Sequence, residues 1–153
     1  MEKLIHSIQI NVFEKKEENL ESVKSSFSII LPIDYKKEKI EINYEKLEGF
    51  RENIIHSFTL IAKKQRHIKI FIENLFTNLH KKDIEKLKNE IDSRLNDEGF
   101  FYIRLDKQSF LKNRIILTDS GDCFHFKIKL AAYPAKRSIF IDSIKKIIEM
   151  YEQ

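Results

Sequence analysis

The sequence predicts an α+β fold with a largely antiparallel sheet and helices packed mainly on one face of that sheet. Two observations lead to this prediction. Short segments alternate apolar and polar residues, as half-buried strands do, and other segments repeat apolar residues every three or four positions, as helices do. The order is strand, helix, two strands, two helices, two strands, helix, and we expect one domain over residues 1–153.

The first part of the chain predicts three strands and a helix. Residues 4–13 form the first expected strand, with the inward residues Ile8, Ile10 and Val12. A helix is expected over residues 17–31, before Pro32 stops the pattern, with the apolar face Leu20, Val23, Phe27 and Ile30. Residues 40–45 alternate, and residues 54–62 are rich in β-branched and aromatic side chains, so both are expected to be strands of a hairpin.

The second part predicts three helices and two strands. One helix is expected around residues 68–79, and Asp83 is expected to cap the next, whose apolar face is Ile84, Leu87, Ile91 and Leu95. After Gly99, residues 101–105 and 124–130 alternate as strands. A terminal helix is expected after Pro134, with the apolar residues Ile139, Ile144, Ile147, Ile148 and Tyr151.

The alternation in the two late strands predicts which side chains are buried. Seven apolar residues should face the helices: Phe101, Ile103, Leu105, Phe124, Phe126, Ile128 and Leu130. Arg104, Lys127 and Lys129 occupy the intervening positions, so we expect them on the opposite, open face of the sheet.

Composition narrows the classes of protein. No stretch approaches the roughly 18 uncharged apolar residues of a membrane span, and the N-terminus lacks the apolar region of a signal peptide, so we expect a soluble, cytoplasmic protein. Only 3 Gly and 2 Pro are present, which excludes a P-loop enzyme. The single cysteine, Cys123, excludes an intramolecular disulfide and a thiolate zinc cluster.

Positive charge is concentrated in one part of the chain. Residues 101–137 carry eight basic and three acidic side chains, a net charge of +5, although the whole chain carries only +4. Residues 51–80 carry a smaller excess, five basic against two acidic side chains. This distribution predicts a face that binds a polyanion.

Two motifs in this basic segment resemble those of a known family. The run Tyr102-Ile103-Arg104-Leu105-Asp106-Lys107-Gln108 is followed by Ala132-Tyr133-Pro134-Ala135-Lys136-Arg137. Both resemble the archaeal RNA-binding proteins that are predicted exosome subunits, with the same order and spacing, and the resemblance covers about residues 98–150. This chain departs from the family after the second strand: the family usually has a Gly-rich turn there, and this chain has only Gly49. The resemblance implies a ribosomal-protein-L-five-like sandwich, similar to the large-subunit protein that binds five-S RNA, and it implies no catalytic residues.

The candidate RNA-binding residues follow from exposure and charge. Lysine and arginine on an open sheet can contact phosphates, and the nearby Tyr102 and Tyr133 can stack on bases. The alternative is that these cations are only the solvated side of amphipathic strands. The candidates are Arg104, Lys107, Gln108, Lys127, Lys129, Lys136 and Arg137.

Two of these positions need separate comment. Lys136 and Arg137 follow Pro134 at a helix start, where backbone N–H groups also attract anions, and we expect both cations to be exposed and to add little stability. At the end of the strand, Asp106 is expected to shape a turn and Lys107 to bind RNA.

Catalysis has little support in the sequence. Asp119, Asp122 and His125, near Cys123, offer oxygen and imidazole ligands for a divalent ion, but residues 119–122 fit an ordinary turn between strands better. No serine or cysteine nucleophile is paired with a base at a characteristic spacing. We therefore expect no metal, no cofactor and no enzymatic activity, and a metal-dependent nuclease is the weaker alternative.

The sequence thus favours a non-catalytic RNA-binding protein that is an accessory factor of RNA processing or of the archaeal exosome. The alternative is a protein-interaction subunit whose basic face docks on an acidic partner in an RNA-processing complex. The expected partners are RNA and exosome- or ribosome-related proteins, with no membrane, and a homodimer is left open.

Overall fold

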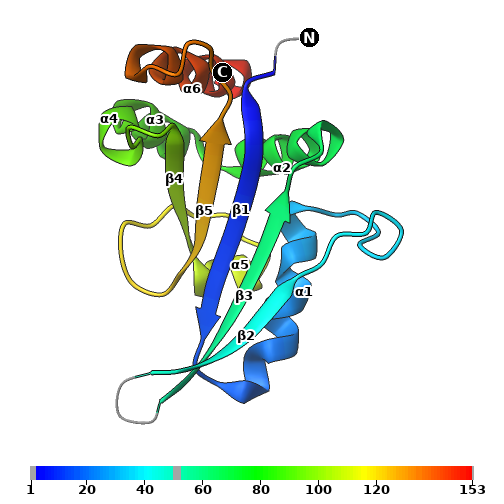
Figure 1. Ribbon diagram of the computed structural model, residues 1–153. Helices are drawn as coiled ribbons and strands as arrows, with labels where there is room; N and C mark the ends of the chain where they lie inside the picture. The colour runs from blue at the N-terminus through cyan, green and yellow to red at the C-terminus, as the bar shows by residue number, and fades with distance from the viewer. Residues whose placement is uncertain (1–2, 50–52, 153) are drawn as a thin grey trace.

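The computed structural model describes residues 3–49 and 53–152 as an α+β fold (Figure 1). The hairpin turn expected just after Gly49 falls partly on residues 50–52, outside the described residues. The strands are β1 (Ile5–Glu14), β2 (Asn43–Glu48), β3 (Ile54–Ala62), β4 (Phe100–Asp106) and β5 (Cys123–Leu130). The helices are η1 (Glu17–Asn19), α1 (Leu20–Ile30), α2 (Gln65–Asn78), α3 (Lys81–Asn89), α4 (Ile91–Arg94), α5 (Lys107–Leu111) and α6 (Arg137–Tyr151).

The five strands form one antiparallel sheet in the order β2-β3-β1-β5-β4. The first strand of the chain therefore lies at the centre, between β3 and β5. Ile10 of β1 lies opposite Leu60 of β3 on one side and opposite Phe126 of β5 on the other. Because opposite residues share a face, the apolar positions of all three central strands point to the same side.

The helices cover one face of the sheet, as the sequence predicts. Figure 1 shows α1, α2 and α5 behind the strands, while α3, α4 and α6 lie near the end of the sheet where β5 leaves it. The phenylalanines of β5 pack against α5 and α2. Between ring centroids, Phe124 lies 4.5 Å from Phe110 of α5, and Phe126 lies 5.5 Å from Phe71 of α2. The seven late-strand residues predicted to be buried are at most 2% exposed, so that prediction is confirmed.

The bounds of several elements differ between the structure and the sequence prediction. The strand expected over residues 40–45 begins at Asn43. The helix expected to begin with an Asp83 cap breaks at Glu90 into α3 and α4, and Asp83 lies inside α3, where its carboxylate accepts a hydrogen bond from the Leu117 N–H. α4 ends at Arg94, so Leu95 lies outside the helix and forms a bridge with Phe101 of β4.

Short-range polar contacts shape the end of β4. The chain turns there into α5, a helix that the alternation pattern did not predict. The Asp106 carboxylate accepts hydrogen bonds from the backbone N–H and the hydroxyl of Ser109, so Asp106 is the N-cap of α5. Its expected structural role is confirmed.

Gly99 joins α4 to β4 at a tightly packed point. Its φ is +88°, and an added Cβ would lie 2.5 Å from the Phe140 ring of α6. The Gly99 carbonyl accepts a hydrogen bond from the Leu130 N–H, which ties the start of β4 to the end of β5. Among the residues described, no helix combines the length and the apolar character needed to cross a lipid bilayer.

Candidate nucleic-acid interface

The face of the sheet opposite the helices carries the candidate site, and we call it the open face. Strand register places its side chains in rows that cross β1, β5 and β4. One row joins Asn11, His125 and Arg104, the next joins Gln9, Lys127 and Tyr102, and the third joins Ser7, Lys129 and Phe100. Arg104, Lys127 and Lys129 therefore share this face, as the alternation predicted.

The two lysines of β5 are held by an aromatic ring. The Lys127 and Lys129 ammonium groups lie 4.2 and 4.5 Å from the centroid of the Phe100 ring, within the range of a cation–π interaction. Lys129 also donates a hydrogen bond of 2.6 Å to the Glu98 carbonyl. Since a ring orients a cation without cancelling its charge, both lysines still present positive charge on the open face.

A small hollow of about 130 Å³ lies on this face between β1, β5 and β4. Its lining includes polar groups from all three strands, among them Gln9, Asn11, Tyr102, Arg104 and Lys127. The Asn11 amide donates to the Ser57 and Thr59 hydroxyls and to the Phe58 carbonyl, so it is fixed in place. A polar floor bordered by cations suits contacts with a nucleic-acid strand.

His125 lines the hollow and Cys123 contacts His125, but neither carries a reactive feature. Burial, with Arg104 nearby, lowers the pKa of His125, so the ring is neutral at pH 7. Burial raises the pKa of the Cys123 thiol, which lies 3.4 Å from His125 Nε2. A raised pKa disfavours the nucleophilic thiolate.

The residues considered as metal ligands do not converge. Asp119 contacts Lys86 and Arg94, while Asp122 contacts Lys107. Within residues 3–49 and 53–152, no group of three or more His, Cys, Asp or Glu side chains is placed to hold a metal ion. Residues 119–122 form bends between α5 and β5, as the turn interpretation expected.

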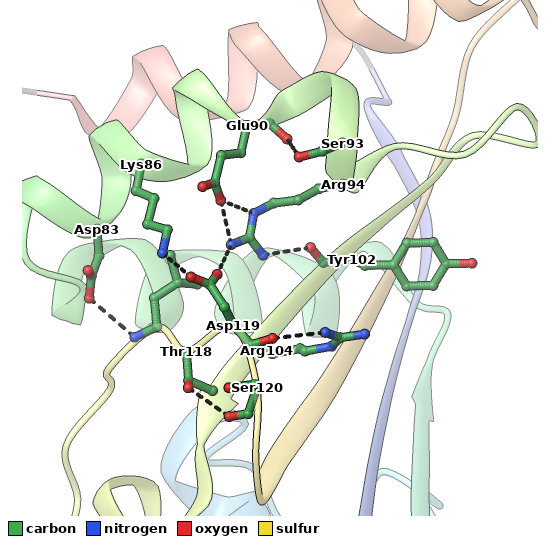
Figure 2. A network of polar contacts seen from close by, with 11 residues as sticks. Asp83, Lys86, Glu90, Ser93, Arg94, Tyr102, Arg104, Thr118, Asp119 and Ser120 are labelled. Carbon is green, nitrogen blue, oxygen red and sulfur yellow. Dashed lines mark hydrogen bonds and ion pairs between the residues drawn. The ribbon is translucent and has the colours of Figure 1, made fainter.

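Asp119 instead organises a network of ion pairs at the edge of β4 (Figure 2). Its carboxylate pairs with Lys86 and, at 3.3 Å, with Arg94, which also pairs with Glu90 at 2.8 Å. The Asp119 backbone carbonyl accepts a hydrogen bond of 3.1 Å from Arg104. The hydrogen bond from Lys86 and its charge hold the pKa of Asp119 below its usual value. This hydrogen bond orients Arg104, which is an exposed residue.

Lys107 does not fit the RNA-binding role expected of it, because the structure places it in the interior. The residue is 1% exposed. Its ammonium group donates to the Phe13 carbonyl at 2.6 Å and pairs with Glu14 at 3.0 Å and Asp122 at 3.2 Å. These contacts link β1, α5 and the 119–122 turn, and they make the Lys107 ammonium group inaccessible to a phosphate. Gln108, the next residue, is exposed on α5.

The corner between β5 and α6 separates its two cations. Lys136 is exposed and is the N-cap residue of α6. Arg137 donates hydrogen bonds to the Leu95 carbonyl at 3.1 Å and to the Asp92 carbonyl at 2.8 Å, and it pairs with Asp97 at 3.3 Å. Arg137 therefore links α6 to α4 and is half-buried, whereas the sequence led us to expect an exposed cation that adds little stability.

The structure adds residues to the site that the sequence did not single out. Gln9 and Asn11 occupy the polar positions of a clear alternation in β1, so the sequence could have predicted that they lie on the open face. The sequence contains no comparable pattern for Arg94 and Lys86, because their ion-pair partner Asp119 lies in a distant segment of the chain.

Relatives of known sequence match almost the whole chain. The chain is 28% identical over 144 residues to "RNA-binding protein PAB1135" of Pyrococcus abyssi (strain GE5 / Orsay), and the match covers 94% of each chain. Among solved structures, protein AF2318 from Archaeglobus fulgidus aligns with a TM-score of 0.81 at 25% identity, over 94% of this chain and 99% of that one.

Further matches agree with these. Mth689 from Methanothermobacter thermautotrophicus aligns with a TM-score of 0.75 at 28% identity, over 95% of this chain and 99% of that one. The model of a family described as "RNA binding" matches residues 7–130, which include the whole open face from β1 to β5. The chain therefore belongs to this RNA-binding family.

Proposed function

We propose that the protein binds RNA, without cleaving it, through the part of the open face formed by β1, β5 and β4. The observation that carries the proposal is the placement of Arg104, Lys127 and Lys129 together on a sheet face that no helix covers within the part of the chain that the structure describes. Membership of an RNA-binding family supports it.

The arrangement suits a phosphate backbone for physical reasons. Each lysine lies over the Phe100 ring, which restrains the side chain and so reduces the entropy lost when a phosphate binds. Arg104 offers guanidinium N–H groups, which match the geometry of phosphate oxygens. Tyr102, on the same face, offers a ring for stacking.

A broader role is part of the proposal. We expect the protein to be a cytoplasmic accessory factor of RNA processing, including the archaeal exosome, with a sandwich fold similar to the ribosomal protein that binds five-S RNA. The support is the resemblance of residues 98–150 described above. Co-purification of exosome or ribosomal proteins with the tagged chain from an archaeal host, resistant to RNase, would test this role.

The direct test of RNA binding is an affinity measurement by fluorescence anisotropy at several salt concentrations. Replacing Arg104, Lys127 and Lys129 by alanine should weaken binding at least about ten-fold and reduce the salt slope by about two units, because each lost phosphate contact on a single strand removes about 0.7 units. The matched control replaces Lys24, Lys69 and Lys145, which are exposed on the helices, and removes the same charge.

The outcomes separate the alternatives. If both triple variants bind as the wild type does, the open face is not the RNA site, and docking of the basic face on an acidic protein takes its place. Purified protein should leave RNA intact. Cleavage that needs a divalent ion and disappears in the His125→Ala and Asp122→Ala variants would support the nuclease alternative instead.

A further inference from the structure

Tyr133 is unusual among the aromatic residues of this chain. It lies between β5 and α6 and is 98% exposed, whereas Tyr102 on the open face is 39% exposed. A phenol ring that packs against nothing is costly to keep in water and leaves both of its faces available. Such a ring is suited to stacking on a planar ligand.

A hollow of about 600 Å³ lies beside this ring. Its lining includes Tyr133, Ala132 and Phe140, together with Lys3, His6 and Lys129. Its volume falls within the roughly 300–1,000 Å³ of typical small-molecule sites. The hollow can therefore accept a group of the size of a nucleotide.

The charge around the hollow is positive and continuous with the open face. Lys129 belongs to both, since it borders the hollow and lies over Phe100 in the sheet. Lys3 contributes a second cation and lies 3.3 Å from His6 Nδ1, and Glu98 contributes one acidic side chain to the rim. Lys136 is exposed three residues after Tyr133.

We propose that this corner holds one unpaired nucleotide of the bound RNA, with its base stacked on Tyr133 and its phosphate near Lys129 and Lys136. The proposal rests on the proposed function, because the neighbouring RNA would lie on the open face. Bases inside a duplex already stack on one another, whereas an unpaired base is free to stack on an aromatic side chain. The preferred ligand is therefore RNA with a single-stranded segment.

The experiment compares two RNAs: a blunt duplex, and the same duplex with a single-stranded tail that contains 2-aminopurine. Tyr133→Ala should weaken binding of the tailed RNA about ten-fold, in line with the usual contribution of one stacked base, and change the affinity for the blunt duplex less than about two-fold. Tyr133→Phe should keep the wild-type affinity because stacking needs only the ring. Tyr44→Ala is the matched control, since Tyr44 is 47% exposed on β2, outside the part of the sheet proposed to bind RNA.

The fluorescence of the tail gives a second reading. The 2-aminopurine signal should fall when the wild type binds and not when Tyr133→Ala binds, and the chain contains no tryptophan to interfere. The inference is overturned if Tyr133→Ala binds the tailed RNA like the wild type, or weakens both RNAs equally. If the wild type binds neither RNA, or the Arg104, Lys127 and Lys129 variant binds both normally, the proposed function itself has failed.

Discussion

Basic side chains of residues 101–137 lie in two kinds of surroundings. At the turn end of the sheet, Lys107 is enclosed by Glu14, Asp122 and the Phe13 carbonyl, so its charge is cancelled within the protein. On the open face, Lys127 and Lys129 lie over the Phe100 ring, which carries no charge. Formal charge counts the two groups equally, but only the second produces a field that a polyanion meets.

The comparison separates stabilising cations from binding cations. A carboxylate neighbour turns a lysine into part of the framework, while an aromatic neighbour orients it and leaves its charge available. Arg137 and Lys136 show the same division at adjacent positions, because Arg137 pairs with Asp92 and Asp97 while Lys136 is exposed. The predictions below test this division.

The largest effect is expected from Lys107→Ala. Removing this ammonium group leaves Glu14, which is 5% exposed, without its ion-pair partner, and breaking a buried pair costs about 3–5 kcal/mol. The free energy of unfolding should fall by that amount in urea denaturation. Lys127→Ala should change it by less than about 0.5 kcal/mol. Equal losses from the two variants would contradict the division.

Acid should weaken the same buried pair. Burial raises the pKa of Glu14, but the Lys16 and Lys15 backbone N–H groups and Lys107 together outweigh it, so the pKa lies below 4.5. A carboxylate with a lowered folded-state pKa stabilises the protein fully above its unfolded value and loses this contribution as the pH falls through the folded value. The free energy of unfolding should therefore decline more steeply below pH 4.5 in the wild type than in Glu14→Gln. Glu21→Gln, an exposed control on α1, should follow the wild type.

At the corner, the two adjacent cations should separate stability from binding. Arg137→Ala should lower the free energy of unfolding by about 1–2 kcal/mol because it removes hydrogen bonds to the Leu95 and Asp92 carbonyls. Lys136→Ala should change stability by less than about 0.5 kcal/mol and reduce the salt slope of RNA binding by about 0.7 units, the value for one contact with a single strand. Thermal unfolding and anisotropy on the same preparations measure both. A Lys136→Ala variant with an unchanged slope would place the phosphate elsewhere.

The smallest effect is a gain of affinity. Asp119→Asn removes the carboxylate that pairs with Lys86 and Arg94, so these cations should join the field beside Arg104 and raise RNA affinity by about two- to three-fold. Because Asp119 is 61% exposed, stability should change by less than about 1 kcal/mol. Glu21→Gln removes the same charge from α1 and should leave the affinity unchanged, and a gain of equal size there would show an effect of net charge alone.

Local patterns were enough to predict most of the sheet. The alternation in β4 and β5 fixes which side chains face the helices, and the observed bounds of β3, Ile54–Ala62, agree with its β-branched run. The open-face positions of Arg104, Lys127 and Lys129 follow from the same alternation. These features depend only on residues that are neighbours in sequence.

The surroundings of the other cations depend on distant residues and were not predictable. Lys107 binds the Phe13 carbonyl, 94 positions away in the chain, and this contact decides that it is buried. The break at Glu90 between α3 and α4 is a local feature, but the continuous apolar pattern does not reveal it either. Charge in a sequence thus identifies candidate cations, and tertiary contacts decide which remain available.

The contact of Gly99 with Phe140 limits how this protein can evolve. Any side chain at position 99 would need a φ that L-residues rarely adopt and would overlap a ring that is 3% exposed. Shrinking Phe140 first would leave a cavity in the core, with a cost of about 3–5 kcal/mol for its truncation to alanine. Each single step is therefore unfavourable, so selection that accepts one substitution at a time is expected to hold these two positions together and, with them, the joint between β4, β5 and α6.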